Sequence, residues 1–243
     1  MNHFMKQVDT VYGRIRYGTL GKTEQKYLFE DTMFPNTPGD WSVYTNEKLR
    51  NLFPNPSLST HSLEQVHGSK IFEITNEVTS DECPIGDGLY TKSGNKILIV
   101  RTADCVPVFL FSKKNPFVSV LHSGWKGTKL GVTEKMIQIY LEFGYTLSDL
   151  YLDLGPYIKG NDYEVREDVA SEFVGLGDGI LKQKAVGTYD LDVGNAILSR
   201  VKTNFSGLQF VNSETKSVFQ NPEYFSHRAK EFGRNLNFIF WEP

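Results

Sequence analysis

The sequence predicts a single domain of the α/β class. Its 243 residues are 40% hydrophobic and 23% charged, which is enough to bury one sizeable core and is typical of a globular protein. Apolar strand-like runs and helical stripes follow one another from residue 96 to the C-terminus. We find no internal repeat and no Pro/Ser-rich linker, so we expect one domain over residues 1–243.

The N-terminal third carries the weakest pattern. Residues 10–20 alternate loosely and predict a strand, and residues 46–53 predict a short helix before the turn Pro54-Asn55-Pro56. From residue 86 onward the pattern sharpens. Strands are predicted at residues 96–100, 106–111 and 117–121.

Helices and strands alternate after this point. Apolar residues recur at helical spacing from Val132 to Phe143, and Gly144 lies where a C-terminal glycine cap belongs, so we expect one helix over residues 128–143. The remaining predicted elements are a strand at 150–154, a helix at 166–174, a strand at 189–193, a helical stripe at 197–205 and a final strand at 238–241.

Charge, cysteine content and hydropathy argue against a nucleic-acid-binding, a disulfide-rich or a membrane-spanning protein. A net charge of -3 gives no general attraction to nucleic acid, so we expect no nucleic-acid partner. Two cysteines are too few for a disulfide framework, and the first residues lack the apolar core of a signal peptide, which favours a cytoplasmic protein. No apolar run approaches the roughly 20 residues that cross a bilayer, so we expect no membrane span.

The strongest functional signal is a cysteine and a histidine that bracket one predicted hairpin. The strands at 106–111 and 117–121 are joined by the polar turn 112–116. If the hairpin is symmetric about the Lys113-Lys114 bond, Cys105 lies directly opposite His122, with Cα atoms about 4.5 to 5.5 Å apart. A thiolate and an imidazole this close are either two metal ligands or a nucleophile and its base.

His67 completes a possible set of three ligands with Cys105 and His122. The spacing does not match a zinc finger, and three protein ligands would leave a fourth position for water or substrate, as in catalytic zinc sites. The alternative is that Cys105 is a small buried apolar residue and that both histidines are merely packed or on the surface.

Several residues near this trio in sequence could bind an anion or orient a ligand. The turn 123–127 leads into the predicted helix, and Lys126 adds a positive charge there. Arg228 and Arg234 are further candidate anion clamps. Asp87 and Asp104 could accept a hydrogen bond from a ligating imidazole. Each of these could equally be an ordinary turn or surface residue.

Taken together, these motifs point to a known family. They are QVHG at 65–68, DGL at 87–89, TADCVPV at 102–108, HSGWKG at 122–127, YEV at 163–165 and FSHR at 225–228. The chain resembles the laccase-domain or polyphenol oxidase family, whose members are described as zinc-containing purine nucleoside phosphorylases. The resemblance covers most of the chain from Gln65 onward. The family usually has arginine at the position of Lys126.

The resemblance implies an α/β fold in which mixed β-sheets pack together with helices on the outside. It also implies a metal held by His67, Cys105 and His122, either zinc or copper. The implied activity is phosphorolysis of adenosine, inosine, guanosine and methylthioadenosine, with deamination of adenosine at the same site, where zinc-activated water would attack the purine. Some relatives are linked instead to editing of peptidoglycan precursors. Lys126 and Arg228 are our candidates for binding phosphate.

Three other functions stay open. In a cysteine-dependent hydrolase or amidase, Cys105 would attack an acyl carbon with His122 as the base, and His67 would have no assigned role. A non-catalytic interaction domain with a structural metal would turn over no nucleoside. A multicopper polyphenol oxidase requires a histidine-rich cluster, whereas this chain has five histidines and no His-x-His pair.

Overall fold

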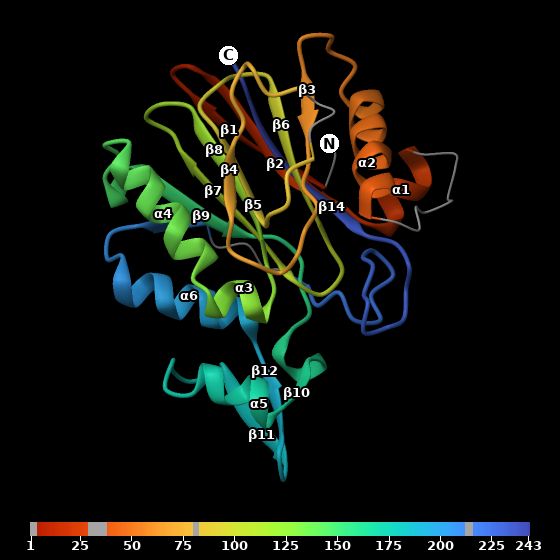
Figure 1. Ribbon diagram of the computed structural model, residues 1–243, viewed down its shortest axis with the longest axis vertical. Coiled ribbons are helices and arrows are strands. Elements are labelled where there is room, and N and C mark those ends of the chain that lie inside the picture. The colour runs from red at the N-terminus through yellow and green to blue at the C-terminus, as the bar shows by residue number, and fades with distance from the viewer. Residues whose placement is uncertain (1–3, 29–37, 80–82, 212–215) are drawn as a thin grey trace.

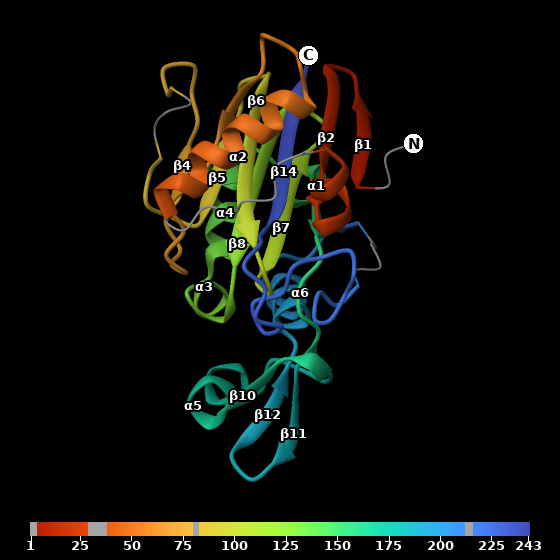
Figure 2. The same ribbon diagram turned by 90° about the vertical axis from the view of Figure 1, so that its right-hand side faces the viewer.

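Two mixed β-sheets pack face to face, and helices cover their outer faces (Figures 1 and 2). The computed structural model describes residues 4–28, 38–79, 83–211 and 216–243. This architecture confirms the predicted α/β class with packed sheets and outer helices.

The first sheet has five strands in the order β1-β2-β14-β6-β3. Its strands are β1 (Met5–Thr10), β2 (Gly13–Leu20), β14 (Asn235–Glu242), β6 (Lys96–Thr102) and β3 (Ser59–His61). Neighbours are antiparallel except for β3 and β6, which are parallel. The C-terminal strand therefore lies at the centre of this sheet, between segments from the first half of the chain.

The second sheet has six strands in the order β13-β9-β7-β8-β5-β4. Its strands are β13 (Gln209–Phe210), β9 (Leu150–Leu154), β7 (Val106–Ser112), β8 (Phe117–Ser123), β5 (Gly88–Thr91) and β4 (Ile71–Glu73). All residues of β7 and β8 are buried, as expected for central strands with both faces covered.

Three apolar clusters hold these layers together. Between the sheets, Ile15 and Val100 of the first sheet pack with Phe109 and Val120 of the second. On the outer face of the six-stranded sheet, α4 (Val132–Glu142) and α6 (Val193–Asn204) contribute to the largest cluster. On the outer face of the five-stranded sheet, α2 (Pro38–Leu52) contributes Leu49. Figure 1 shows α4 and α2 on opposite sides of the paired sheets.

The predicted helix at 128–143 is wrong in one respect, because two helices occupy this region. The short α3 (Trp125–Lys129) ends before Gly131, whose φ of 71° interrupts the helix, and α4 follows. The predicted cap at Gly144 is confirmed: its φ is 83°, and its N–H donates to the carbonyl of Leu141 at 2.9 Å.

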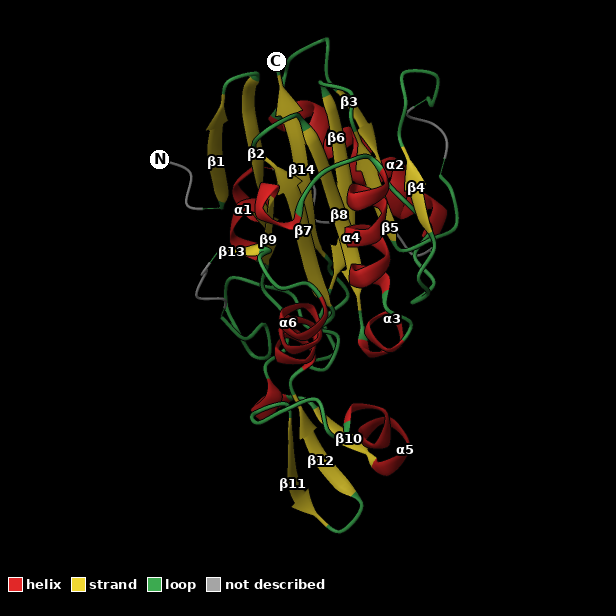
Figure 3. Ribbon diagram, turned by 90° about the vertical axis from the view of Figure 1, so that its left-hand side faces the viewer, coloured by secondary structure: helices red, strands yellow, loops and turns green. Residues whose placement is uncertain are grey.

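A smaller three-stranded sheet projects beyond α3 and α6 (Figure 3). It contains β10 (Glu164–Arg166), β12 (Thr188–Leu191) and β11 (Leu181–Ala185), in that order, and carries α5 (Glu167–Ala170). Short 3-10 turns η1 (Leu147–Asp149), η2 (Gly160–Asp162) and η3 (Ser171–Phe173) and the helix α1 (Lys22–Leu28) complete the elements.

The β7–β8 hairpin exists as predicted, but its register differs by two residues. Pro107 pairs with His122, and Ser112 pairs with Phe117. Pro116 has no N–H to donate, so it lies in the turn and pairing begins at Phe117. Cys105 is therefore not directly opposite His122. A register shift of two residues keeps each side chain on the same face of the sheet. Cys105 and His122 therefore still lie on one face, as predicted.

Candidate metal centre

Three separate segments bring His67, Cys105 and His122 together. His67 lies in the loop between β3 and β4, Cys105 immediately precedes β7, and His122 is near the end of β8. One ligand atom from each residue lies within 4.8 Å of the other two. His122 is buried, Cys105 is partly buried and His67 is exposed, so the group is open to solvent on one side.

A buried carboxylate fixes both histidines. Asp87 is fully buried, and its Oδ1 accepts hydrogen bonds from His122 Nδ1 at 2.8 Å and from the backbone N–H of His67 at 2.9 Å. Its Oδ2 accepts from the N–H of Gly68 at 2.6 Å. The predicted role of Asp87 as acceptor for the His122 imidazole is thus confirmed. With Nδ1 occupied, Nε2 is the His122 nitrogen available to a ligand.

The backbone at His67 is unusual for a residue that is not glycine. Its φ is 58°, in the left-handed region. Such a conformation costs about 1–3 kcal/mol and persists only when the surrounding contacts impose it. The hydrogen bonds from His67 and Gly68 to Asp87 supply those contacts.

Gly124 leaves the space in which the ligand side chains meet. A Cβ at this position would lie 2.8 Å from Cys105 Sγ and 3.3 Å from His67 Cδ2. Any larger residue would displace one of the two side chains. This crowding gives a physical reason for glycine directly after His122-Ser123.

The electrostatics favour a thiolate at Cys105. Burial opposes its ionisation, but His122 and His67 outweigh burial and lower the pKa of Cys105 to about 6. Burial likewise opposes the charged form of His122, yet Cys105 and Asp87 raise its pKa to about 9. Burial raises the pKa of Asp87, but the His122 and backbone hydrogen bonds lower it overall. In the metal-free protein these shifts favour a thiolate at Cys105 and an imidazolium at His122.

The donor set suits a zinc ion. Two imidazole nitrogens and one thiolate are common zinc ligands, and catalytic zinc sites combine three protein ligands with one open position. Copper also binds nitrogen and sulfur donors well. The residues therefore fit a zinc or a copper ion.

In the described part of the chain, neither Lys126 nor Arg228 is hydrogen-bonded to a side chain of the trio. Lys126 is exposed on α3, which has five residues and so is shorter than the helix that we predicted to present its N-terminus to an anion. Arg228 is exposed, and its guanidinium carbon lies 5.1 Å from the centre of the Tyr163 ring. Its backbone N–H donates to Asp104, the residue before Cys105. Their assignment to phosphate stays a prediction.

The structure corrects the partner predicted for Asp104. Its carboxylate accepts from Ser226 Oγ at 2.6 Å and from the N–H of Arg228 at 2.8 Å, and among the described residues it bonds to no imidazole. Tyr163 was quoted above only as part of a motif. Burial is the main cause that raises the pKa of Tyr163 to about 12, and the negative charge of Cys105 raises it further.

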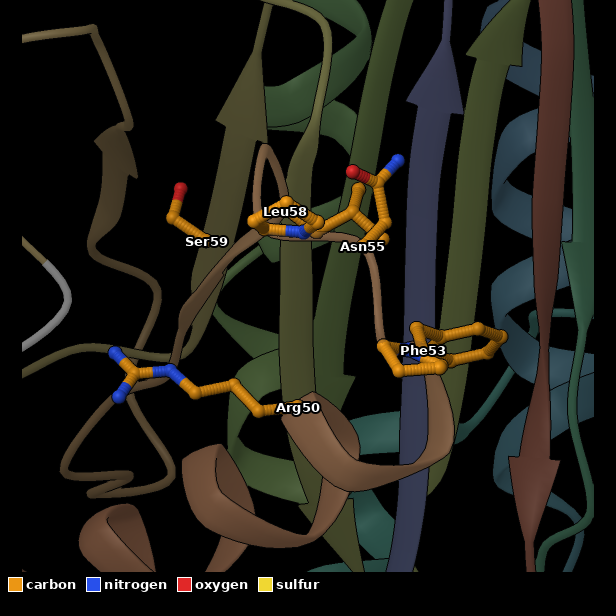
Figure 4. A pocket seen from close by; sticks show the side chains of 7 residues that line it. Arg50, Phe53, Asn55, Leu58 and Ser59 are labelled. Atoms are coloured by element: carbon orange, nitrogen blue, oxygen red, sulfur yellow. The ribbon is translucent and has the colours of Figure 1, made fainter.

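A second feature of the surface is separate from this centre. An open cavity at the C-terminal end of α2 is lined by Arg50, Phe53, Asn55, Leu58 and Ser59 (Figure 4). None of these residues belongs to the trio. Within the described ranges, His67, Cys105 and His122 form the one group of at least three metal-ligating side chains. None of the described helices is long and apolar enough to span a membrane.

Sequence comparisons agree with this assignment of motifs. Residues 40–242 match the family model described as multi-copper polyphenol oxidoreductase laccase, and the chain belongs to that family. A Clostridium acetobutylicum protein named purine nucleoside phosphorylase is 34% identical over 181 residues, which are 73% of this chain and 75% of that protein. The Bacillus subtilis purine nucleoside phosphorylase YlmD is 28% identical over 213 residues, covering 81% of this chain and 76% of the relative. These names favour an enzyme that acts on small molecules.

Solved structures share the fold. The Bacillus licheniformis hypothetical protein YfiH superposes with a TM-score of 0.78 at 22% identity, covering 95% of this chain and 93% of the other. YlmD from Geobacillus stearothermophilus gives a TM-score of 0.75 at 22% identity, covering 94% and 92%. At this identity the likeness concerns the fold alone.

Proposed function

We propose that this chain is a metal-dependent purine nucleoside phosphorylase with adenosine deaminase activity at the same site. The observation that carries the proposal is the convergence of His67, Cys105 and His122 within 4.8 Å at a position open to solvent. The names of the curated relatives support the phosphorylase part. Adenosine, inosine, guanosine and methylthioadenosine are the proposed nucleosides.

The three ligands would hold zinc, or copper in the same donor set. When bound, zinc supplies Lewis-acid chemistry that polarises a water molecule or a substrate oxygen. Asp87 keeps the His122 Nδ1 proton in place, so the ring stays in the tautomer that ligation through Nε2 requires. The exposed face of His67 leaves room for a nucleoside to approach.

Phosphorolysis depends mainly on positioning and on charge. Phosphate must reach the anomeric carbon of the ribose as the base leaves, giving free base and ribose 1-phosphate. Arg228 is the stronger candidate to bind the phosphate, since a guanidinium can hold two oxygens at once. Lys126 would add a second positive charge from α3. Such groups accelerate the reaction by holding the two reactants together and by stabilising charge.

One incubation tests both reactions. Purified protein with adenosine and phosphate should release adenine and ribose 1-phosphate by phosphorolysis, and inosine and ammonia by deamination. Hypoxanthine would then follow by phosphorolysis of inosine. Chromatography separates these products. Absence of any free base or inosine from zinc-loaded protein would contradict the proposal.

A cysteine-dependent hydrolase is the second candidate, and one observation favours it. Cys105, His122 and Asp87 are arranged as thiol, imidazole and carboxylate, and the pKa of Cys105 is lowered to about 6. Acyl substrates such as amide precursors of peptidoglycan would then react at Cys105. In that case His67→Ala would retain the activity, and metal-free protein would be the active form. If the enzyme is metal-dependent, His67→Ala should lose activity and the metal-free protein should be inactive.

A further inference from the structure

Asp104 has a backbone conformation that requires outside support. Its φ is 100°, a region that residues with a side chain rarely adopt. A strained residue of this kind persists only where the surrounding structure over-determines it, and such residues cluster at functional sites. Asp104 is also the residue directly before Cys105.

Three hydrogen bonds from two other loops fix Asp104. Its carboxylate accepts from Ser226 Oγ at 2.6 Å and from the N–H of Arg228 at 2.8 Å. Its backbone carbonyl accepts from the N–H of Ile158 at 3.0 Å. Ser226 is fully buried, so its hydroxyl contact is protected from water. Asp104 therefore joins the segment of the thiolate ligand to the loop that carries Arg228.

That loop is itself firmly anchored. Glu231 Oε2 accepts from the N–H of Ser226 at 2.7 Å, and Lys22 of α1 bonds to the other oxygen of Glu231. The Ser226 hydroxyl also accepts from the N–H of Ala229 at 3.2 Å. Asp104 is thus bonded to a loop that has further hydrogen bonds of its own.

Asp104 fixes the backbone of Arg228, and the Arg228 side chain then packs against the segment that leads into β10. Its guanidinium lies over the Tyr163 ring, with 5.1 Å between the guanidinium carbon and the ring centre, and Nη2 donates to the carbonyl of Glu164 at 3.0 Å. Among the described residues this is the guanidinium's one hydrogen bond. The rest of the donor fork is therefore available to an anion.

We propose that Asp104 is a positioning residue that sets the distance between the Cys105 thiolate and the Arg228 guanidinium, so that one carboxylate aligns metal ligand and phosphate clamp. The inference rests on the proposed function for its phosphate part and is independent of it for the thiolate part. Asp87 places the two histidines through the His122 imidazole and the His67 backbone N–H, and Asp104 places the Arg228 backbone beside the segment that carries Cys105.

Two variants isolate the carboxylate from the backbone strain. Asp104→Gly accommodates the positive φ and removes the carboxylate, while Asp104→Asn keeps one oxygen and turns an NH2 group toward a donor. Ser226→Ala removes one contact and should act in the same direction with a smaller effect. Asp149→Asn is the matched control. Like Asp104, Asp149 accepts hydrogen bonds from a hydroxyl and a backbone N–H, here Thr146 Oγ1 at 2.7 Å and Thr146 N at 2.9 Å. It lies at the end of the β7–β9 pair that is far from Cys105.

The first readout is metal binding and needs no turnover. Zinc affinity from competition with a chromophoric chelator should fall about 10–100-fold in Asp104→Gly, the usual effect of losing a residue that orients a ligand. With Co²⁺ in place of zinc, the thiolate-to-cobalt absorption band should weaken or shift. Asp149→Asn should match the wild type in both measurements. Circular dichroism establishes that each variant is folded.

The second readout separates phosphate binding from the rest of the reaction. In zinc-saturated Asp104→Gly, the KM for inorganic phosphate should rise about tenfold, the effect of one lost charge-assisted hydrogen bond. Deamination needs no phosphate, so its KM for adenosine should change less than the KM for phosphate. A general structural defect would lower both activities together.

The outcomes distinguish this inference from the proposed function. If folded Asp104→Gly and Asp104→Asn bind zinc and Co²⁺ like the wild type, the positioning role is wrong. Equal losses in Asp149→Asn would also overturn it. If the wild-type protein phosphorolyses no nucleoside, the proposed function fails, and the zinc and Co²⁺ measurements still decide whether Asp104 orients Cys105.

Discussion

Replacing Asp87 by asparagine should weaken both the fold and the metal site. Asp87 is fully buried and accepts three short hydrogen bonds, from His122 Nδ1, the His67 N–H and the Gly68 N–H. Asparagine offers one acceptor oxygen, so in either orientation its NH2 group faces at least one donor. The cost is one hydrogen bond to a charged group and one unsatisfied buried donor, about 3 kcal/mol in total.

This magnitude predicts a clear shift in thermal unfolding. For a chain of this size, about 1 kcal/mol changes Tm by roughly 2–4 °C, so Asp87→Asn should unfold about 6–12 °C below the wild type. Zinc affinity should fall about 10–100-fold, because the residue orients a ligating imidazole. Asp9→Asn is the control, since Asp9 is 74% exposed and forms a surface ion pair with Arg14. An Asp87→Asn protein with unchanged Tm and zinc affinity would refute the reasoning.

Three further predictions test the same centre. Cys105→Ser should lose stoichiometric zinc, measured by mass spectrometry of metals, whereas Cys83→Ser should retain it; zinc lost from both or neither would contradict the assignment. In metal-free protein, the rate at which iodoacetamide alkylates Cys105 should fall as the pH drops through about 6. The reason is that the pKa of this thiol is lowered from 9.0 to about 6, and the thiolate is the form that reacts. A midpoint near pH 9 would count against the thiolate–imidazolium pair. Gly124→Ala should lower zinc affinity without unfolding the chain, because the new Cβ would lie 2.8 Å from Cys105 Sγ; unaltered affinity would show that the ligands are not crowded there.

Local patterns in the sequence identify most of the fold. The β7–β8 hairpin and β9 lie where alternation places them, and α6 and β14 overlap the predicted helix at 197–205 and strand at 238–241 but begin earlier. The break at Gly131 was missed because the apolar stripe continues through it, and a glycine inside a helical pattern is often tolerated. The hairpin register was misjudged because the centre of a four-residue turn is not fixed by its apolar flanks.

The sequence predicts the metal-ligating side chains of the candidate site but not the contacts that hold them in place. A cysteine and two histidines are rare enough to be singled out, and the structure brings their ligand atoms together. The contacts of Asp104 with Ser226 and Arg228 join residues more than 120 positions apart, so no local pattern reveals them. The effect of Cys105 on the pKa of Tyr163 likewise depends on how the small three-stranded sheet, which follows Tyr163, is attached to the two large sheets.

X-ray absorption spectroscopy of the zinc-loaded protein tests the central claim most directly, because it reports the atoms bound to the metal. His67, Cys105 and His122 predict one sulfur neighbour at about 2.3 Å and two imidazole nitrogens at about 2.0–2.1 Å from each zinc ion. The sulfur signal should vanish in Cys105→Ser. Zinc surrounded by oxygen and nitrogen alone in the wild-type protein would contradict the account.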